Sequence, residues 1–162
     1  MRFMLLAALV VGLDQLSKLW ILKNFVLYES QVVIPEFFNL TLVMNRGAAF
    51  GFLAGVESAW RHYFFLILGS VALIILVIAW IRIRHVQALY GTALPLIAGG
   101  ALGNMIDRLQ HGAVVDFFDV YVGSYHWPAF NIADSAIFVG VFLFLIGNVL
   151  ESRAEKKALK MP

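Results

Sequence analysis

The sequence predicts an all-α integral membrane protein with four transmembrane helices and a small β-containing extracytoplasmic segment between the first two helices. Of the 162 residues, 62% are hydrophobic and only 14% are charged, whereas soluble domains carry about 25% charged residues. The mean hydropathy is +0.86, and the apolar residues lie in runs long enough to cross a bilayer. A soluble enzyme, a disordered chain and a nucleic-acid-binding module are therefore largely excluded.

Four segments have the length and composition of membrane spans: about 3–22, 63–81, 87–106 and 132–150. A hydrocarbon core of ~30 Å takes about 20 helical residues at ~1.5 Å each. No small-x-small cleavage site follows the apolar part of the first segment, so we expect an uncleaved spanning helix rather than a signal peptide. The whole chain, residues 1–162, is expected to form a single membrane domain.

The distribution of lysine and arginine predicts the orientation of these spans. Seven basic residues lie at the two termini and in the short turn after the second span: Arg2, Arg82, Arg84, Arg153, Lys156, Lys157 and Lys160. Four lie in the two longer connecting segments: Lys23, Arg46, Arg61 and Arg108. Because cytoplasmic loops carry an excess of basic residues, both termini and the basic tail 151–162 are expected in the cytoplasm. The loops at about 23–61 and 107–131 are then outside.

The two outer loops differ in composition. Residues 37–43 alternate between apolar and polar side chains and are rich in β-prone types, which predicts a small strand pair lying on the membrane. The second loop carries Tyr121, Tyr125 and Trp127, aromatic residues that are suited to the level of the lipid headgroups.

Charged side chains within the spans are default candidates for function, because each costs about 2.5–3.5 kcal/mol at bilayer depth. Asp14 and Lys18 are spaced i, i+4 with the acid first, the favourable order for a pair within one helix. Two interpretations remain open. The residues form a self-neutralising pair that eases insertion, or Asp14 faces a functional site.

Small and polar residues gather near the end of the third span. Gly99 and Gly103 have the small-xxx-small spacing that lets helices approach closely. Asn104, Asp107 and Arg108 follow on one helix face. Asp107 fits a structural contact between helices, whereas Arg108 is also suited to orient a carboxylate.

Two further aspartates are expected at the outer boundary of the membrane. Asp116 lies between bulky apolar neighbours, which favour the neutral acid. Asp134 follows Asn131 by three residues at the start of the fourth span, which is also an ordinary helix-capping arrangement. Two close carboxylates that cannot both ionise share a proton. One then acts as general base on water while the other, protonated, polarises a carbonyl.

The sequence lacks the residue patterns that several other catalytic chemistries need. The absence of cysteine excludes disulfides, thiolate nucleophiles and cysteine-ligated metals. No Gly-x-Ser-x-Gly motif is present. The four histidines show no ligand-like spacing and fall on both sides of the membrane: His62, His85, His111 and His126. We therefore expect no metal and no cofactor.

A cluster of small and polar residues follows the β-prone stretch at residues 45–51, Asn-Arg-Gly-Ala-Ala-Phe-Gly. It has the composition of a loop tip. Alternatively, its small residues let an extended peptide approach the backbone while Asn45 hydrogen-bonds that peptide.

The ordered motifs resemble those of the lipoprotein signal peptidases (signal peptidase II), bacterial aspartic endopeptidases of the inner membrane. The resemblance covers nearly the whole chain and rests on five motifs: Asp14-Gln15-Leu16-Ser17-Lys18, Asn45-x-Gly47-Ala48-Ala49-Phe50, Gly103-Asn104-x-x-Asp107-Arg108, Val115-Asp116-Phe117 and Phe130-Asn131-x-Ala133-Asp134. Five motifs in this order are highly specific, although each alone is weak.

This resemblance implies a function and a set of site residues. The family cuts diacylglyceryl-modified prolipoproteins N-terminal to the lipidated cysteine, and it is the target of the cyclic peptide globomycin. Asp116 and Asp134 would be catalytic. The residues that would bind substrate or support the site are Asp14, Lys18, Asn45, Gly47, Asn104, Arg108, Asn131 and Ala133. Substrate and membrane lipid are the expected partners, and a monomer is expected because one chain supplies every motif.

Two rival functions use the same residues. In a small proton- or ion-coupled transporter, Asp14, Lys18 and the outer aspartates would form a relay. The two middle spans carry no ionisable residue at mid-depth, however, and the chain has no inverted repeat. In a membrane subunit without catalytic activity, Asp116 and Asp134 would only cap a helix or anchor the structure.

Overall fold

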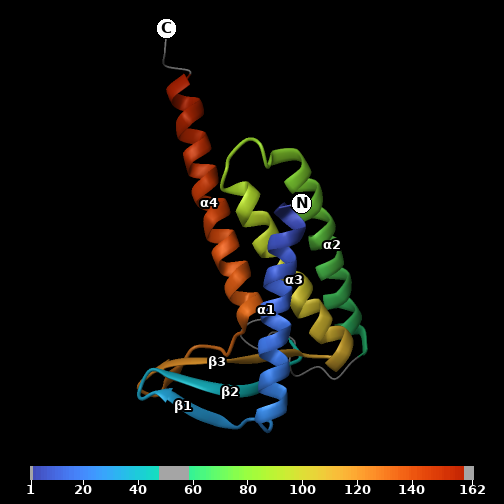
Figure 1. The fold of residues 1–162 in the computed structure, drawn as a ribbon, viewed down its shortest axis with the longest axis vertical. Coiled ribbons are helices and arrows are strands. Elements are labelled where there is room, and N and C mark those ends of the chain that lie inside the picture. The colour runs from blue at the N-terminus through green and yellow to red at the C-terminus, as the bar shows by residue number, and fades with distance from the viewer. Residues whose placement is uncertain (1, 48–58, 159–162) are drawn as a thin grey trace.

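The structure is a computed structural model that describes residues 2–47 and 59–158. Within these residues, four helices form a bundle and a small antiparallel sheet lies across one end of it (Figure 1). The elements in chain order are α1 (Arg2–Asn24), β1 (Ser30–Ile34), β2 (Phe38–Asn45), α2 (Ala59–Ile83), α3 (Tyr90–His111), β3 (Val114–Val122), β4 (Tyr125–His126) and α4 (Ile132–Ala158). Helix α4 extends well beyond the predicted end of its span at 150, and Lys160 of the basic tail lies outside the described residues.

Helix α1 has the burial pattern of a helix that meets lipid. Its buried residues share one face: Val10, Asp14, Lys18 and Ile21. Most of its leucines are exposed, and Leu5 and Leu16 are more than half exposed. Charged groups inside and leucines outside are the reverse of a soluble protein. Three of the described helices are long and apolar enough to cross a membrane, at Arg2–Asn24, Trp60–Ile83 and Ile132–Ala154.

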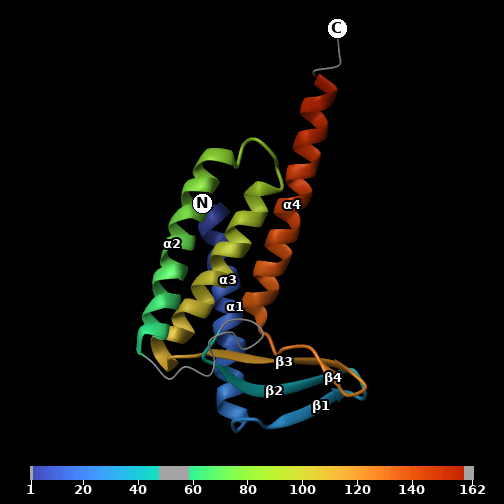
Figure 2. The same cartoon turned by 180° about the vertical axis from the view of Figure 1, so that it is seen from behind.

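Helix α3 lies at the centre of the bundle and packs against α1, α2 and α4. Figure 2 shows it between α2 and α4, with α1 behind it. Glycines make this close packing possible. A Cβ on Gly99 would lie 2.8 Å from the Ala7 carbonyl oxygen of α1, and one on Gly100 would overlap the Ala133 carbonyl oxygen of α4. Helix α3 is the helix with the most buried residues, and many of them are small.

The sheet has the order β1-β2-β3-β4, and every neighbouring pair is antiparallel. Strands β1 and β2 confirm the β structure predicted between the first two helices. Strands β3 and β4 come from the segment between α3 and α4, where the sequence patterns above predict only a loop. The missed strand β3 is nevertheless rich in β-branched and aromatic residues, which favour strands.

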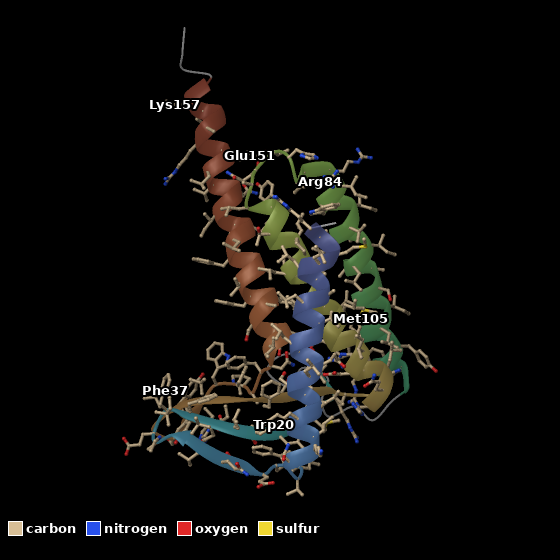
Figure 3. The ribbon with its side chains drawn as sticks, viewed as in Figure 1. Trp20, Phe37, Arg84, Met105, Glu151 and Lys157 are labelled. Carbon is tan, nitrogen blue, oxygen red and sulfur yellow. The ribbon has the colours of Figure 1, made fainter. Side chains whose placement is uncertain are left out.

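The sheet is fixed to the bundle by an apolar cluster at the end of α1. Ile21 of α1 and Phe25, just after the helix, pack with Leu42 of β2 and with Val115 and Phe117 of β3. Asp116, between the last two, therefore points to the other side of the strand, toward the helices. Phe37 marks the far end of the sheet, whereas Arg84, Glu151 and Lys157 lie at the opposite end of the molecule (Figure 3).

Candidate active site

A cavity of about 690 Å³ lies where the sheet meets α3 and α4. Its polar lining includes Ser135 and the following residues singled out from the sequence: Asn45, Gly47, Asn104, Arg108, Asp116 and Asp134. Its apolar lining comes largely from α4 and the segment before it, and includes Trp127, Phe130, Ile137, Phe138 and Val141. Polar groups at one end of an apolar cavity are typical of a binding site.

Asp116 enters the cavity from β3. It follows a tight turn in which Gly112, with φ of +69°, ends α3 and donates its N–H to the Arg108 carbonyl oxygen. The Asp116 side chain is 2% exposed. Its carboxylate accepts hydrogen bonds from Asn45 Nδ2 at 3.0 Å and from Asn131 Nδ2 at 2.7 Å. Burial, reinforced by the charge of Asp134, raises the pKa of Asp116 to about 7 despite these two donors.

Asp134 enters the same cavity from the first turn of α4. Asn131 and Asp134 form a reciprocal cap, in which the Asp134 N–H donates to Asn131 Oδ1 at 2.9 Å and the Asn131 N–H donates to Asp134 Oδ2 at 3.3 Å. The ordinary capping arrangement is therefore present. Asp134 Oδ1 also accepts a bond from Asn104 Nδ2 of α3 at 2.8 Å, so the carboxylate is held by two helices.

A buried ionic cluster lies behind the two aspartates. Lys18 Nζ lies 2.7 Å from Asp14 Oδ2 and 2.7 Å from Asp107 Oδ2, and it donates to Asn104 Oδ1 at 3.0 Å. The i, i+4 pair expected in α1 is present and shares its cation with a second acid. Asp14 Oδ1 also accepts the backbone N–H of Ala133 at 2.9 Å. Lys18 and Asp14 thus connect the site residues of α1, α3 and α4.

Two residues of this cluster have contacts that no sequence signal revealed. Asp107 Oδ2 accepts the backbone N–H of Val115 at 3.0 Å, which fixes the start of β3. Gln15 Nε2 donates to Asp107 Oδ1 at 2.8 Å and to the Gly103 carbonyl oxygen at 3.2 Å. Gln15 follows Asp14 directly in the sequence, but no periodic pattern indicates that an amide there reaches α3.

Arg108 and the residues at the end of β2 line another part of the cavity. Arg108 Nη2 donates to the Gly47 carbonyl oxygen at 2.6 Å, and the Gly47 N–H donates to Asn45 Oδ1 at 3.0 Å. The Arg108 guanidinium also lies over the Phe65 ring, 4.2 Å from its centroid. The rest of the cluster predicted here, Ala48 to Gly51, lies outside the described residues.

Outside the cavity, His126 Nδ1 lies 2.7 Å from Asp119 Oδ1 near the far end of the sheet. In the part of the chain that the structure describes, no group of three His, Cys, Asp or Glu side chains is placed to hold a metal ion. The described side chains that line the cavity include carboxylates, amides, one guanidinium and the Ser135 hydroxyl.

Comparison with known proteins identifies the family of this chain. The family model described as signal peptidase (SPase) II matches residues 6–150. The lipoprotein signal peptidase of Syntrophus aciditrophicus is 45% identical over 154 residues, 95% of each chain. That of Janthinobacterium sp. is 52% identical over 141 residues, 86% of this chain and 83% of its own. A bacterial membrane enzyme solved by the in meso method at 2.3 Å resolution has a TM-score of 0.81 and 38% identity, covering 93% of this chain and 88% of its own. This chain belongs to the signal peptidase II family.

Proposed function

We propose that this protein is a membrane-embedded aspartic endopeptidase that removes the signal peptide from diacylglyceryl-modified prolipoproteins. It would cleave N-terminal to the lipidated cysteine, with Asp116 and Asp134 as the catalytic pair. The observation that carries the proposal is that Asn131 hydrogen-bonds both aspartates, at the polar end of one apolar cavity. Membership of the signal peptidase II family supplies the substrate class.

In the proposed reaction, the aspartate pair shares one proton. We place that proton on Asp116, because Asp116 is buried in the sheet whereas Asp134 lies at the N-terminus of α4, where the helix dipole favours a negative charge. Asp134 takes a proton from water as the oxygen attacks the scissile carbonyl carbon, and Asp116 donates its proton to the carbonyl oxygen. When the C–N bond breaks, Asp134 returns a proton to the leaving amine and Asp116 recovers its own.

The other cavity residues have supporting roles in this proposal. Asn45, Asn104 and Asn131 orient the carboxylates through the hydrogen bonds described above. Arg108 and the Gly47 backbone are placed to hold the substrate peptide. Asp14, Lys18 and Ala133 fix α1 against the start of α4. No step requires a metal or a cofactor.

The apolar wall of the cavity fits a lipid-anchored substrate. Ile137, Phe138 and Val141 lie on α4 and continue the cavity along the helix, where acyl chains or the signal helix would meet it. Cyclic peptide inhibitors of the globomycin type would occupy the same space. One chain supplies every site residue, so we propose a monomer.

The proposed orientation places the sheet and the cavity at the outer face of the bacterial inner membrane. We propose that all four helices span the membrane, and that α3 does so packed against the other three. Helix α1 begins and α4 ends on the side away from the sheet (Figure 1). Arg84 and Lys157 lie on that side too (Figure 3), and an excess of basic residues favours the cytoplasm. Both termini would then be cytoplasmic.

Purified protein in detergent should cleave a synthetic lipobox peptide that carries diacylglyceryl cysteine and should leave the unlipidated peptide intact. Asp116→Asn and Asp134→Asn should each lower the rate by about 10³-fold or more. Asp119→Asn is the matched control, because Asp119 lies on the same strand but points to His126. Full activity in either Asp116→Asn or Asp134→Asn would rule out the catalytic pair, and a transporter or purely structural protein would cleave neither peptide.

A further inference from the structure

Arg108 is held at the cavity by a ring and a carbonyl group. Its guanidinium lies 4.2 Å from the centroid of the Phe65 ring, and its Nη2 donates to the Gly47 carbonyl oxygen at 2.6 Å. Among the described residues, Arg108 forms no ion pair with a carboxylate, unlike Lys18 and His126. A cation that lines a cavity with two aspartates is therefore not paired with either of them.

The surrounding charges favour such a pair. Arg108 is attracted by Asp116 of β3, Asp107 of its own helix and Asp134 of α4, and it is repelled by Arg61 of α2. Lys18 of α1 also faces both Asp116 and Asp134, but it is already shared between Asp14 and Asp107. Guanidinium and carboxylate groups readily form two parallel hydrogen bonds. Some other contact must therefore keep Arg108 away from the catalytic pair.

Phe65 provides that contact. The face of an aromatic ring carries negative potential, so it attracts a guanidinium without donating or accepting a proton. Phe65 lies on α2 and is only half-buried, next to the more exposed Phe64. Its ring is thus available to the arginine on one side while the helix faces lipid on the other.

We propose that Phe65 is a positioning residue that holds the Arg108 guanidinium away from Asp116 and Asp134 and on the Gly47 carbonyl oxygen. This inference rests on the proposed function for its meaning in catalysis. An arginine paired with either aspartate would favour the ionised carboxylate and would remove the shared proton at neutral pH. Phe65 would therefore preserve the singly protonated state that the reaction needs.

The same contact also orients a hydrogen-bond donor of the site. Arg108 fixes the Gly47 carbonyl oxygen, and the Gly47 N–H fixes Asn45 Oδ1. The Asn45 amide then presents its Nδ2 to Asp116. A chain of contacts thus runs from the ring on α2 to the carboxylate on β3.

The first test replaces the aromatic ring with an aliphatic side chain. Phe65→Leu should lower kcat about tenfold, with a smaller effect on KM. It should also move the alkaline limb of the pH–rate profile to lower pH by about 1, because Arg108 then pairs with an aspartate. Phe64→Leu, one residue earlier on the same helix, is the matched control and should leave kcat and both limbs unchanged.

The second test separates the charge effect from packing. Phenylalanine analogues with one, two and three ring fluorines, incorporated at position 65, keep the shape of the ring while weakening its negative face. The logarithm of kcat should fall steadily with each fluorine. The same analogues at position 64 should have no effect. Wild-type activity across the whole series at position 65 would overturn the inference.

A third measurement needs no turnover. Infrared titration of the carboxylic acid C=O stretch, with Asp116→Asn to assign the band, follows the shared proton directly. In Phe65→Leu the band should disappear at lower pH than in the wild-type protein. An unchanged titration would overturn the inference even if the wild-type protein cleaved no lipopeptide. That absence of cleavage would count against the proposed function alone.

Discussion

Asn131 Nδ2 donates to Asp116 Oδ1 at 2.7 Å, so the residue that caps α4 also holds the carboxylate of β3. Its own N–H and Oδ1 complete the reciprocal cap with Asp134. A helix cap accounts for the second set of bonds but not for the first. The position of Asn131 therefore links the geometry of the two aspartates to the first turn of α4.

These two roles of Asn131 can be separated by substitution. Serine caps a helix well, but its side chain is too short to reach Asp116. Alanine neither caps the helix nor reaches Asp116. Asn131→Ser and Asn131→Ala should both lose most of the peptidase activity. Asn131→Ala should in addition be less stable than Asn131→Ser by about 1 kcal/mol, measured from thermal unfolding in detergent. Equal activity in Asn131→Ser and wild type would show that the bond to Asp116 is dispensable.

The pH dependence of cleavage should report the proton shared by the aspartate pair. With the pKa of Asp116 raised to about 7 by burial and by Asp134, kcat/KM should fall as the pH rises above that value and the pair loses its proton. Asn45→Ala removes a donor that stabilises the ionised form, so the alkaline limb should move to higher pH.

Asn39→Ala offers a matched control for that change. Asn39 also lies on β2, and its Nδ2 donates to a carboxylate of β3 at 2.9 Å, but that carboxylate is Asp119. Its pH–rate profile should match that of the wild-type protein. A profile that is flat between about pH 4 and pH 8 in the wild-type protein would contradict a shared proton.

Much of this architecture follows from local patterns. The apolar runs locate the helices, because spanning a bilayer imposes a length on each one. The five motifs contain most of the polar residues that line the cavity but little of its apolar wall. Asp14 and Lys18 are recognisable as a pair because both lie on one helix face.

Contacts between distant segments could not be predicted in this way. The charge of Lys18 is shared with Asp107, which lies on another helix. Strand β3 could not be recognised from the sequence because Asp116 and Asp119 interrupt its apolar pattern. Phe65 looks like any other lipid-facing aromatic residue of α2 until the fold places Arg108 over it. Each of these features depends on tertiary structure rather than on periodicity.

Removing the buried cation should destabilise the bundle. Lys18→Met leaves Asp14 and Asp107 buried without their shared counter-charge, and breaking a buried ion pair costs about 3–5 kcal/mol. The midpoint of thermal unfolding should fall sharply. Lys23→Met is the control, since Lys23 is exposed at the end of the same helix. Adding Asp107→Asn to Lys18→Met should recover part of the loss, because one uncompensated charge then disappears.

Gly100 should be the most sensitive glycine of α3. A methyl group there would overlap the Ala133 carbonyl oxygen and would lie 2.7 Å from Ile137 Cγ1. Gly100→Ala should therefore separate α3 from α4 and lower stability by about 1–3 kcal/mol, the usual cost of overpacking. It should also impair cleavage, because Asp134 lies next to Ala133.

Gly12→Ala is the matched control for Gly100→Ala. A Cβ at Gly12 would meet nothing within 4 Å, and alanine favours a helix over glycine by up to about 1 kcal/mol. The variant should therefore be as stable as the wild-type protein or slightly more stable. Equal unfolding midpoints for Gly100→Ala and Gly12→Ala would contradict the close contact between α3 and α4.

Asp116 of β3, one of the two proposed catalytic aspartates, should itself reduce the stability of the fold at high pH. The pKa of Asp116 is about 7 in the folded protein, against an ordinary value of 3.8. As the pH rises between these values, the unfolded chain loses this proton first, so the folded state is progressively disfavoured. Above about pH 7 both states are ionised and the cost is constant.

The substitution Asp116→Asn avoids this cost, because a side-chain amide cannot ionise. Its loss of hydrogen-bond complementarity with Asn45 and Asn131 does not depend on pH. The unfolding free energy of Asp116→Asn relative to wild type should therefore rise by about 1–3 kcal/mol between about pH 4 and pH 8. A difference between Asp116→Asn and wild type that stays constant across this range would mean that Asp116 carries no proton in the folded protein at neutral pH.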